Sequence, residues 1–146
     1  MSTLTVGTIA EKVVDAGVSI DSLTIKDGAL SLAVAQKANT FTGTLASVSG
    51  VLNFDTYNNF LITLASGSNS LANPSTEAGN VGQTGVMIII QPSSGSAGTV
   101  SLGTDYETAE SAGLTLSSGN NDYDIVPYII KADNSILIGI PALNFG

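Results

Sequence analysis

The stretch Gly85-Val86-Met87-Ile88-Ile89-Ile90-Gln91-Pro92 holds five consecutive apolar residues between a glycine and a proline. Four of the five are β-branched, and so short a run is typical of a strand shielded on both faces rather than of a helix. We therefore expect residues 86–90 to form a buried strand that a second sheet covers on one face and a neighbouring subunit on the other. If Val86, Ile88 and Ile90 pack within the subunit while the alternate residues, Met87 and Ile89, face a partner chain, a trimer is indicated. If one subunit covers all five side chains, oligomerisation must rest on other residues.

Short strand candidates recur around this run, from Thr40 to Gly146, with turn residues such as Ser66–Asn69 and Asp133-Asn134 between them. This spacing predicts an all-β domain over residues 40–146, a β-sandwich that is jelly-roll-like. Pro127 cannot donate to a ladder, so its strand is expected at a sheet edge or at a bulge. The predicted strands are Phe41–Leu45, Val51–Phe54, Phe60–Leu64, Val86–Gln91, Thr99–Leu102, Leu114–Leu116, Ile125–Lys131 and Ile136–Ile140.

Residues 1–39 predict an extended N-terminal arm with its own short strands. Thr8 and Glu11 have the spacing of a capping box, so a short helix beginning there is the alternative to extended chain. Further on, apolar and polar residues alternate before an Asp27-Gly28 turn. Neither element can bury a core alone, so we expect the arm to bind a partner. The candidate partner-binding residues are Ile9, Val13, Val14, Val18, Ile20, Leu23 and Ile25.

The charge balance limits the partners. Among 146 residues, four are Lys or Arg and twelve are Asp or Glu, which gives a formal net charge of −8. An acidic protein repels nucleic acid and anionic membranes, and no apolar run approaches the roughly 18 residues that a membrane span needs. We expect neither nucleic acid nor a membrane as a partner.

The side chains that most catalysis depends on are missing from the sequence. There is no His, Cys or Trp, and all four basic residues are Lys. This removes the usual general base at neutral pH, the thiolate metal ligand and the bidentate guanidinium. We predict no enzymatic activity, no cofactor and no metal site.

Three weaker patterns have competing interpretations. Residues 120–124 gather oxygen donors as a calcium loop does, but a solvated turn is favoured because the EF-hand spacing is absent. Two of the acidic side chains of Asp105, Glu107 and Glu110 could form the carboxylate pair that glycoside hydrolysis requires, although an exposed acidic loop is favoured. The aromatic residues divide between a possible sugar-stacking set, Tyr57, Tyr106, Tyr123 and Tyr128, and a predicted core set, Phe41, Phe54 and Phe60.

A series of short motifs resembles a module of structural proteins in tailed bacteriophage virions. Upstream of them, residues 17–21 and 25–28 are similar to a segment of phage fibre and head-decoration proteins. The motifs of the module are Phe60–Leu64, Leu71–Pro74, Gly82–Val86 leading into Ile88–Gln91, Gly103–Tyr106, Leu114–Leu116, Asp124–Tyr128 and Ile136–Gly139.

The resemblance implies a capsid decoration, or cement, protein that binds the major capsid protein through its N-terminal arm and forms a homotrimer. Its location would be the capsid surface of the virion, after assembly in the host cytoplasm. The alternative is a short tail or head fibre, or a spike component, that recognises host glycan.

Overall fold

The computed structural model describes residues 38–145. The chain divides into two units between residues 36 and 37, and the fold below is that of the second. Apart from residues 38 and 39, the predicted arm lies outside the described residues. All seven candidate partner-binding residues therefore lie outside them too, and their assignment stays a prediction.

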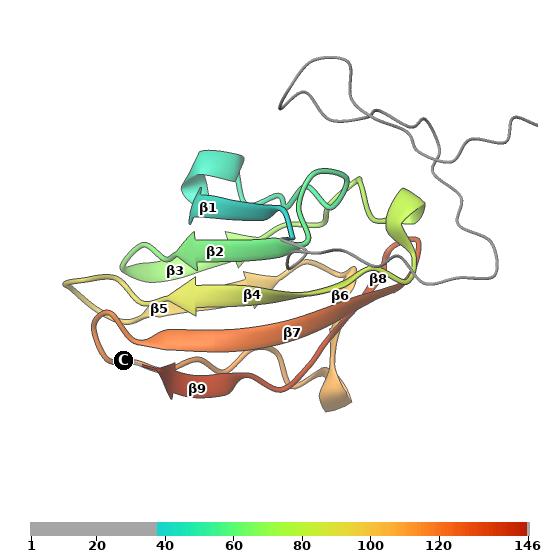
Figure 1. Cartoon of the computed structure of the whole chain (residues 1–146). Coiled ribbons are helices and arrows are strands. Elements are labelled where there is room, and N and C mark those ends of the chain that lie inside the picture. The colour runs from blue at the N-terminus through green and yellow to red at the C-terminus, as the bar shows by residue number, and fades with distance from the viewer. Residues whose placement is uncertain (1–37, 146) are drawn as a thin grey trace, which may run out of the picture. The chain divides into compact units, whose positions relative to one another are not determined.

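The described unit is all-β, as predicted, and its main element is a mixed seven-stranded sheet (Figure 1). The strands run in the order β1-β2-β4-β7-β8-β6, with β9 also paired to β7. The β1-β2-β4 and β6-β8 pairs are parallel, whereas β7 is antiparallel to β4, β8 and β9. The strands are β1 (Thr40–Thr44), β2 (Asn59–Thr63), β4 (Thr84–Ile90), β6 (Tyr106–Thr108), β7 (Tyr123–Ala132), β8 (Ser135–Ile138) and β9 (Ala142–Phe145).

A second sheet contains only β3 (Gly67–Leu71) and β5 (Gly98–Leu102), paired in parallel. Gln91 bridges from the end of β4 to the start of β5: its amide nitrogen donates to the carbonyl oxygen of Gly98 at 3.1 Å, and its amide oxygen accepts from the Gly98 N–H at 2.7 Å. Three short 3₁₀ helices lie in the connections, η1 (Ala46–Val48), η2 (Ala78–Asn80) and η3 (Ala109–Ser111). A jelly roll pairs its strands antiparallel, so the parallel ladders are a feature that the sequence did not predict.

Both sheets contribute to one hydrophobic core. The predicted aromatic core residues are found there, with Phe54 and Phe60 almost fully buried and Phe41 packed against them. The rings of Phe54 and Phe60 meet edge-on with centroids 5.3 Å apart. Such edge-to-face pairs add about 0.5–1.5 kcal/mol beyond the area they bury.

Within residues 38–145, the central run on β4 is fully buried on one face only. Met87 and Ile89 are 1% and 3% exposed, whereas Val86, Ile88 and Ile90 are partly exposed. The expected assignment of faces is therefore reversed, because the side chains that point toward the core are Met87 and Ile89. On the side of β2, Gly85 passes so close to the Asn58 carbonyl oxygen that any Cβ would collide with it.

Pro127 occupies the middle of β7, which is not an edge strand. It lies opposite Val86 on β4, and on its other side β7 pairs first with β9 and then with β8. Register shifts occur at residues 123–125 and 130–132, on either side of Pro127 and not at it. The expectation of an edge or a bulge at Pro127 was wrong; the neighbouring strand is interrupted there instead.

Six of the eight predicted strands are confirmed to within two residues. Val51–Phe54 and Leu114–Leu116 are not strands, although Leu52 and Phe54 are buried. The sequence failed to predict three strands: β3, where a turn was expected, β6, where an acidic loop was expected, and β9.

Candidate functional site

The seven-stranded sheet has an apolar surface on the side that faces away from the core. Successive side chains of a strand point to opposite faces, so the residues between the buried ones form this second surface. We call it the outer face. Its apolar residues are Leu61, Val86, Ile88, Ile90, Tyr123, Ile125, Pro127, Ile129, Leu137 and Phe145, and beyond them the same side of the sheet ends in the exposed Thr40, Thr42 and Thr44 of β1.

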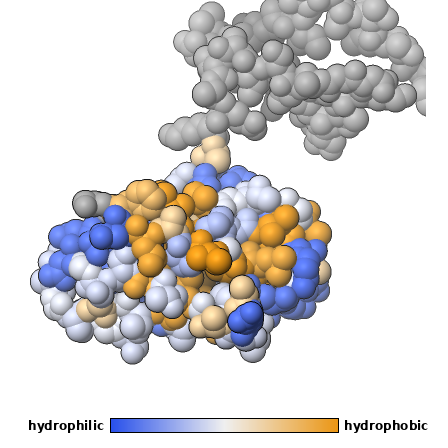
Figure 2. Space-filling model, turned by 90° about the horizontal axis from the view of Figure 1, so that it is seen from below, coloured by the Kyte–Doolittle hydropathy of each residue, from blue (hydrophilic) through white to orange (hydrophobic). Residues whose placement is uncertain are grey.

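Strand register joins these residues into rows across the sheet. One row runs through Leu61, Ile88 and Ile125 on β2, β4 and β7. A second runs from Ile90 through Tyr123 to Phe145, on β4, β7 and β9. Among residues 38–145, six of the eight large apolar residues that are most exposed lie between residues 123 and 145, and Figure 2 shows apolar residues gathered across the side of the unit where β9 lies.

The small sheet has the opposite character. The side chains of β3 and β5 that point away from the core are Ser68, Ser70, Thr99 and Ser101, all exposed and all hydroxyl-bearing. A sheet with one solvated face normally alternates apolar and polar residues in this way. The outer face of the large sheet departs from that pattern within the same unit.

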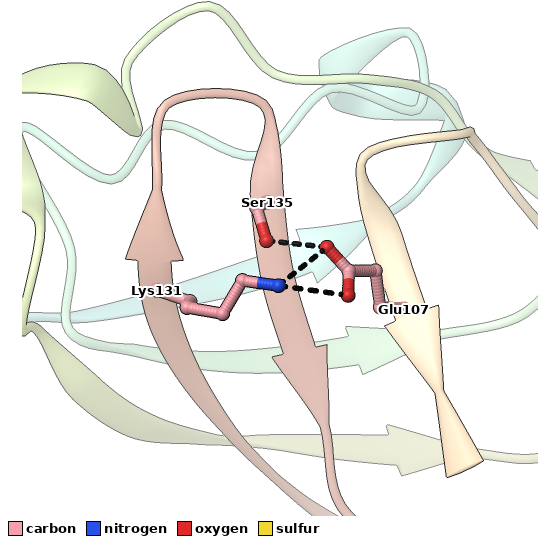
Figure 3. Close-up of polar contacts among 3 residues, drawn as sticks. All are labelled: Glu107, Lys131 and Ser135. Carbon is pink, nitrogen blue, oxygen red and sulfur yellow. Dashed lines mark hydrogen bonds and ion pairs between the residues drawn. The ribbon is translucent and has the colours of Figure 1, made fainter.

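The charged groups at the margin of the outer face neutralise each other. Lys131 Nζ donates to both carboxylate oxygens of Glu107, at 3.2 and 3.1 Å, and Ser135 Oγ donates to Glu107 Oε1 (Figure 3). The hydrogen bond from Ser135 and those from Lys131 lower the pKa of Glu107. Because both charged side chains are about half exposed, the pair adds little stability and leaves no net charge at this edge.

A shallow hollow of about 270 Å³ lies on the outer face between β7 and β8. It forms over Gly139, where a Cβ would lie 2.7 Å from Pro127 Cγ. Ile140, the next residue along the chain, is 83% exposed. The hollow is lined by Pro127, Tyr128, Ile129, Leu137, Ile138 and Gly139.

At residues 120–124 a solvated turn was favoured over a calcium loop, but the carboxylates there bind donors of the chain itself. Asp124 is fully buried and accepts hydrogen bonds from the N–H and Oγ of Ser117 at 2.7 and 2.5 Å, and from the N–H of Asn144 at 3.0 Å. Asp122 accepts from the Gly119 N–H at 2.9 Å. Asp124 therefore fastens β9 and the segment before β7 to the sheet.

The expected acidic loop is not a loop, because residues 106–108 form β6. Asp105 and Tyr106 are buried, so only Glu107 and Glu110 expose their side chains. Glu77 is buried as well, and neither its Oε2 nor the Tyr106 hydroxyl has a hydrogen-bond partner among the described residues. Burial, followed by the nearby carboxyl groups of Glu77 and Asp105, raises the pKa of Tyr106.

The possible sugar-stacking residues do not share one surface. Tyr106 and Tyr128 are buried, and Tyr57 packs against the core. The Tyr128 hydroxyl donates to the Asn58 carbonyl oxygen at 2.8 Å, and burial raises its pKa. Tyr123 alone is exposed, and it pairs with Phe145 on the outer face.

The sequence prediction left one face of the run at residues 86–90 for a partner, but it assigned Met87 and Ile89 to that face and did not reveal how far the apolar surface extends over the other strands. The signal of the outer face was present in the run of residues 86–90, in which the side chains that point to either face of the strand are all apolar. That pattern was attributed to cover by a second sheet on one face and by a neighbouring subunit on the other. Within the described unit one face is covered, and cover of the other by a subunit stays a prediction.

Comparison with protein-family models, curated proteins and solved structures finds no match to this chain. Within residues 38–145, no helix is long and apolar enough to cross a membrane.

Proposed function

We propose that this chain is a structural protein of a phage virion, a decoration or cement protein on the outer surface of the capsid. Its described unit would be a β-sandwich formed by the two sheets around their shared core, and its N-terminal arm would bind the major capsid protein. The observation that carries the proposal is the outer face, an apolar sheet surface on an otherwise acidic unit. Extended exposed apolar surfaces of this kind mark sites of association.

The mechanism is thermodynamic linkage between binding of this protein and assembly of the shell. A protein that binds only the assembled shell stabilises that shell by the free energy of binding, and no chemical step is needed. The composition agrees with this role, because the chain lacks His and Cys altogether. The resemblance of its motifs to phage virion proteins gives the direction of the proposal.

The test is co-sedimentation of the full chain with assembled, undecorated phage heads, compared with a chain lacking residues 1–28. We expect the full chain to pellet with the heads and the truncated chain to stay in solution while keeping its β-type circular dichroism spectrum. Undiminished binding by the truncated chain would contradict the role of the arm. Images of virions that show the protein on the tail and not on the head would contradict decoration.

A fibre or spike component that binds host glycan is the second candidate, and one observation favours it. Tyr123 and Phe145 are both exposed and lie side by side on β7 and β9, and aromatic faces of this kind stack on sugars. A glycan array on which binding is lost in Tyr123→Ala would favour this function over decoration.

A further inference from the structure

We propose that the outer face is the contact between copies of this chain, with a second copy as its occupant. The inference rests on the proposed role as an assembled structural protein, and it adds the surface through which the copies meet. Its test uses neither capsid nor glycan.

The size and continuity of the outer face are the first step. Its apolar rows span β2, β4, β7 and β9 without an interposed charge. The hydroxyl-rich outer surface of β3 and β5 shows that this unit can present a solvated sheet face. An apolar surface of this extent is costly to leave in water and gains free energy when another apolar surface covers it.

The distribution of charged residues favours a second copy of the chain as the occupant of the outer face. Residues 38–145 contain eight acidic side chains and one Lys, so two copies repel each other over most of their surface. Apart from Glu107, which pairs with Lys131, the acidic groups that are not buried lie outside the strands of the outer face, in the connections between them: Asp55, Glu110, Asp122 and Asp133. A basic partner would find no counter-charge on this face, whereas a second copy brings the same uncharged, apolar surface.

Shape agrees with self-association. The outer face carries an apolar hollow over Gly139, with the exposed side chains of Ile129 and Leu137 beside it. In a contact between identical surfaces, each copy supplies both the side chain and the site that receives it. A second copy therefore offers apolar side chains to the hollow and accepts them in return.

The experiment is analytical ultracentrifugation of the full chain over a range of concentrations, with two substitutions that add the same charge. Ile88→Glu places a carboxylate at the centre of the outer face, and Thr99→Glu places one on the exposed surface of β5. We expect the wild type and Thr99→Glu to form the same oligomer. We expect Ile88→Glu to weaken association at least ~100-fold, because its unpaired charge would be buried in the contact.

A second pair of variants tests the proposal without relying on a buried charge. Because the chain has no Cys, Ile88→Cys and Thr99→Cys each introduce a single thiol. In the oligomer, we expect a thiol reagent to modify position 88 slowly and position 99 fast. On dilution to the monomer, the rate at position 88 should rise while the rate at position 99 stays unchanged.

Three results would overturn the proposal. A wild type that stays monomeric over the concentration range shows that copies do not associate, and an oligomer unchanged by Ile88→Glu shows that they meet elsewhere. A monomeric chain with a protected thiol at position 88 shows that the same chain covers the face. Loss of capsid binding with the oligomer intact would count against the proposed function alone.

Discussion

Pro127 on β7 lies against Gly139, and the pair accounts for a proline in the interior of a sheet. The Gly139 N–H donates to the Pro127 carbonyl oxygen at 2.9 Å. The nitrogen and carbonyl of one residue in a strand point to the same side, so the missing N–H of Pro127 faces the interval between β8 and β9. The ladder between β7 and β8 ends at Ile138, and the absent side chain of Gly139 makes room for the pyrrolidine ring.

Gly139→Ala should destabilise the unit, because its Cβ would lie 2.7 Å from Pro127 Cγ. We expect a loss of about 1–3 kcal/mol in the free energy of unfolding, measured by urea denaturation. The matched control is Gly79→Ala: the atom nearest to its new Cβ is Asp55 Oδ1 at 4.0 Å, and its effect should be neutral or slightly stabilising.

Because the new Cβ at position 139 clashes with the ring of Pro127, the effects of substitutions at these two positions should be coupled. In a Pro127→Ala background the ring is gone, so Gly139→Ala should cost less than it does in the wild type. An equal cost in both backgrounds would show that the destabilisation has another source.

Asp124→Asn should destabilise the unit although it preserves the shape of the side chain. Both carboxylate oxygens of Asp124 accept hydrogen bonds, from Ser117 and Asn144. Asn replaces one of these acceptor oxygens with an NH₂ group. That donor would face another hydrogen-bond donor in place of an acceptor, which costs roughly 1–3 kcal/mol. The exposed Asp133→Asn is the control and should stay within about 0.5 kcal/mol of the wild type by urea denaturation.

The strands richest in β-branched and aromatic residues were predictable, whereas pairing and polar strands were not. The run at residues 86–90 identifies β4, but local pattern does not reveal that β2 lies beside it in parallel. β3 consists of Gly, Ser and Asn before Leu71, so propensity indicates a turn, and its pairing with β5 overrides that preference. Conversely, Val51–Phe54 alternates like a strand but buries Leu52 and Phe54 from a loop.

The extent of the outer face, and which side chains of β4 belong to it, were out of reach for a related reason. Its residues come from β2, β4, β7, β8 and β9, and only the strand register brings them together. Tyr123 and Phe145 are 22 residues apart in sequence and become neighbours through the pairing of β7 with β9. Sequence periodicity assigns side chains to two faces of a strand but does not say which of them a second layer covers.

The pKa of Glu107 provides a test of the contacts in Figure 3. Hydrogen bonds from Ser135 and Lys131 lower that pKa from its ordinary value of 4.5. Ser135→Ala and Lys131→Met should each raise it, which a titration of the side-chain carboxyl carbon by NMR measures. Since the folded pKa is the lower one, the associated stability is present above about pH 4.5 and is lost as the pH falls through the folded value.

An unchanged pKa of Glu107 in both variants would show that these contacts are not formed in solution. Asp133→Asn is the control, because it removes a nearby exposed charge in the turn between β7 and β8 without removing a donor to Glu107.

Tyr106 should make the unit sensitive to alkali. Burial raises the pKa of Tyr106 above its ordinary value of 10.0, so the folded protein keeps a proton that the unfolded chain releases. The free energy of unfolding should therefore fall as the pH rises above about 10. Tyr106→Phe removes this titration and should flatten the fall between about pH 9 and about pH 11, as measured by urea denaturation at each pH.

Comparison with Tyr128→Phe separates titration from hydrogen bonding. The Tyr106 hydroxyl has no partner among the described residues, so its removal should be neutral or stabilising near pH 7. The Tyr128 hydroxyl donates to Asn58 and accepts from Gln83 at 3.1 Å, so its removal should cost about 0.5–1.5 kcal/mol. Equal losses in the two variants at neutral pH would contradict the unpartnered state of Tyr106, because they would require a hydrogen bond to its hydroxyl.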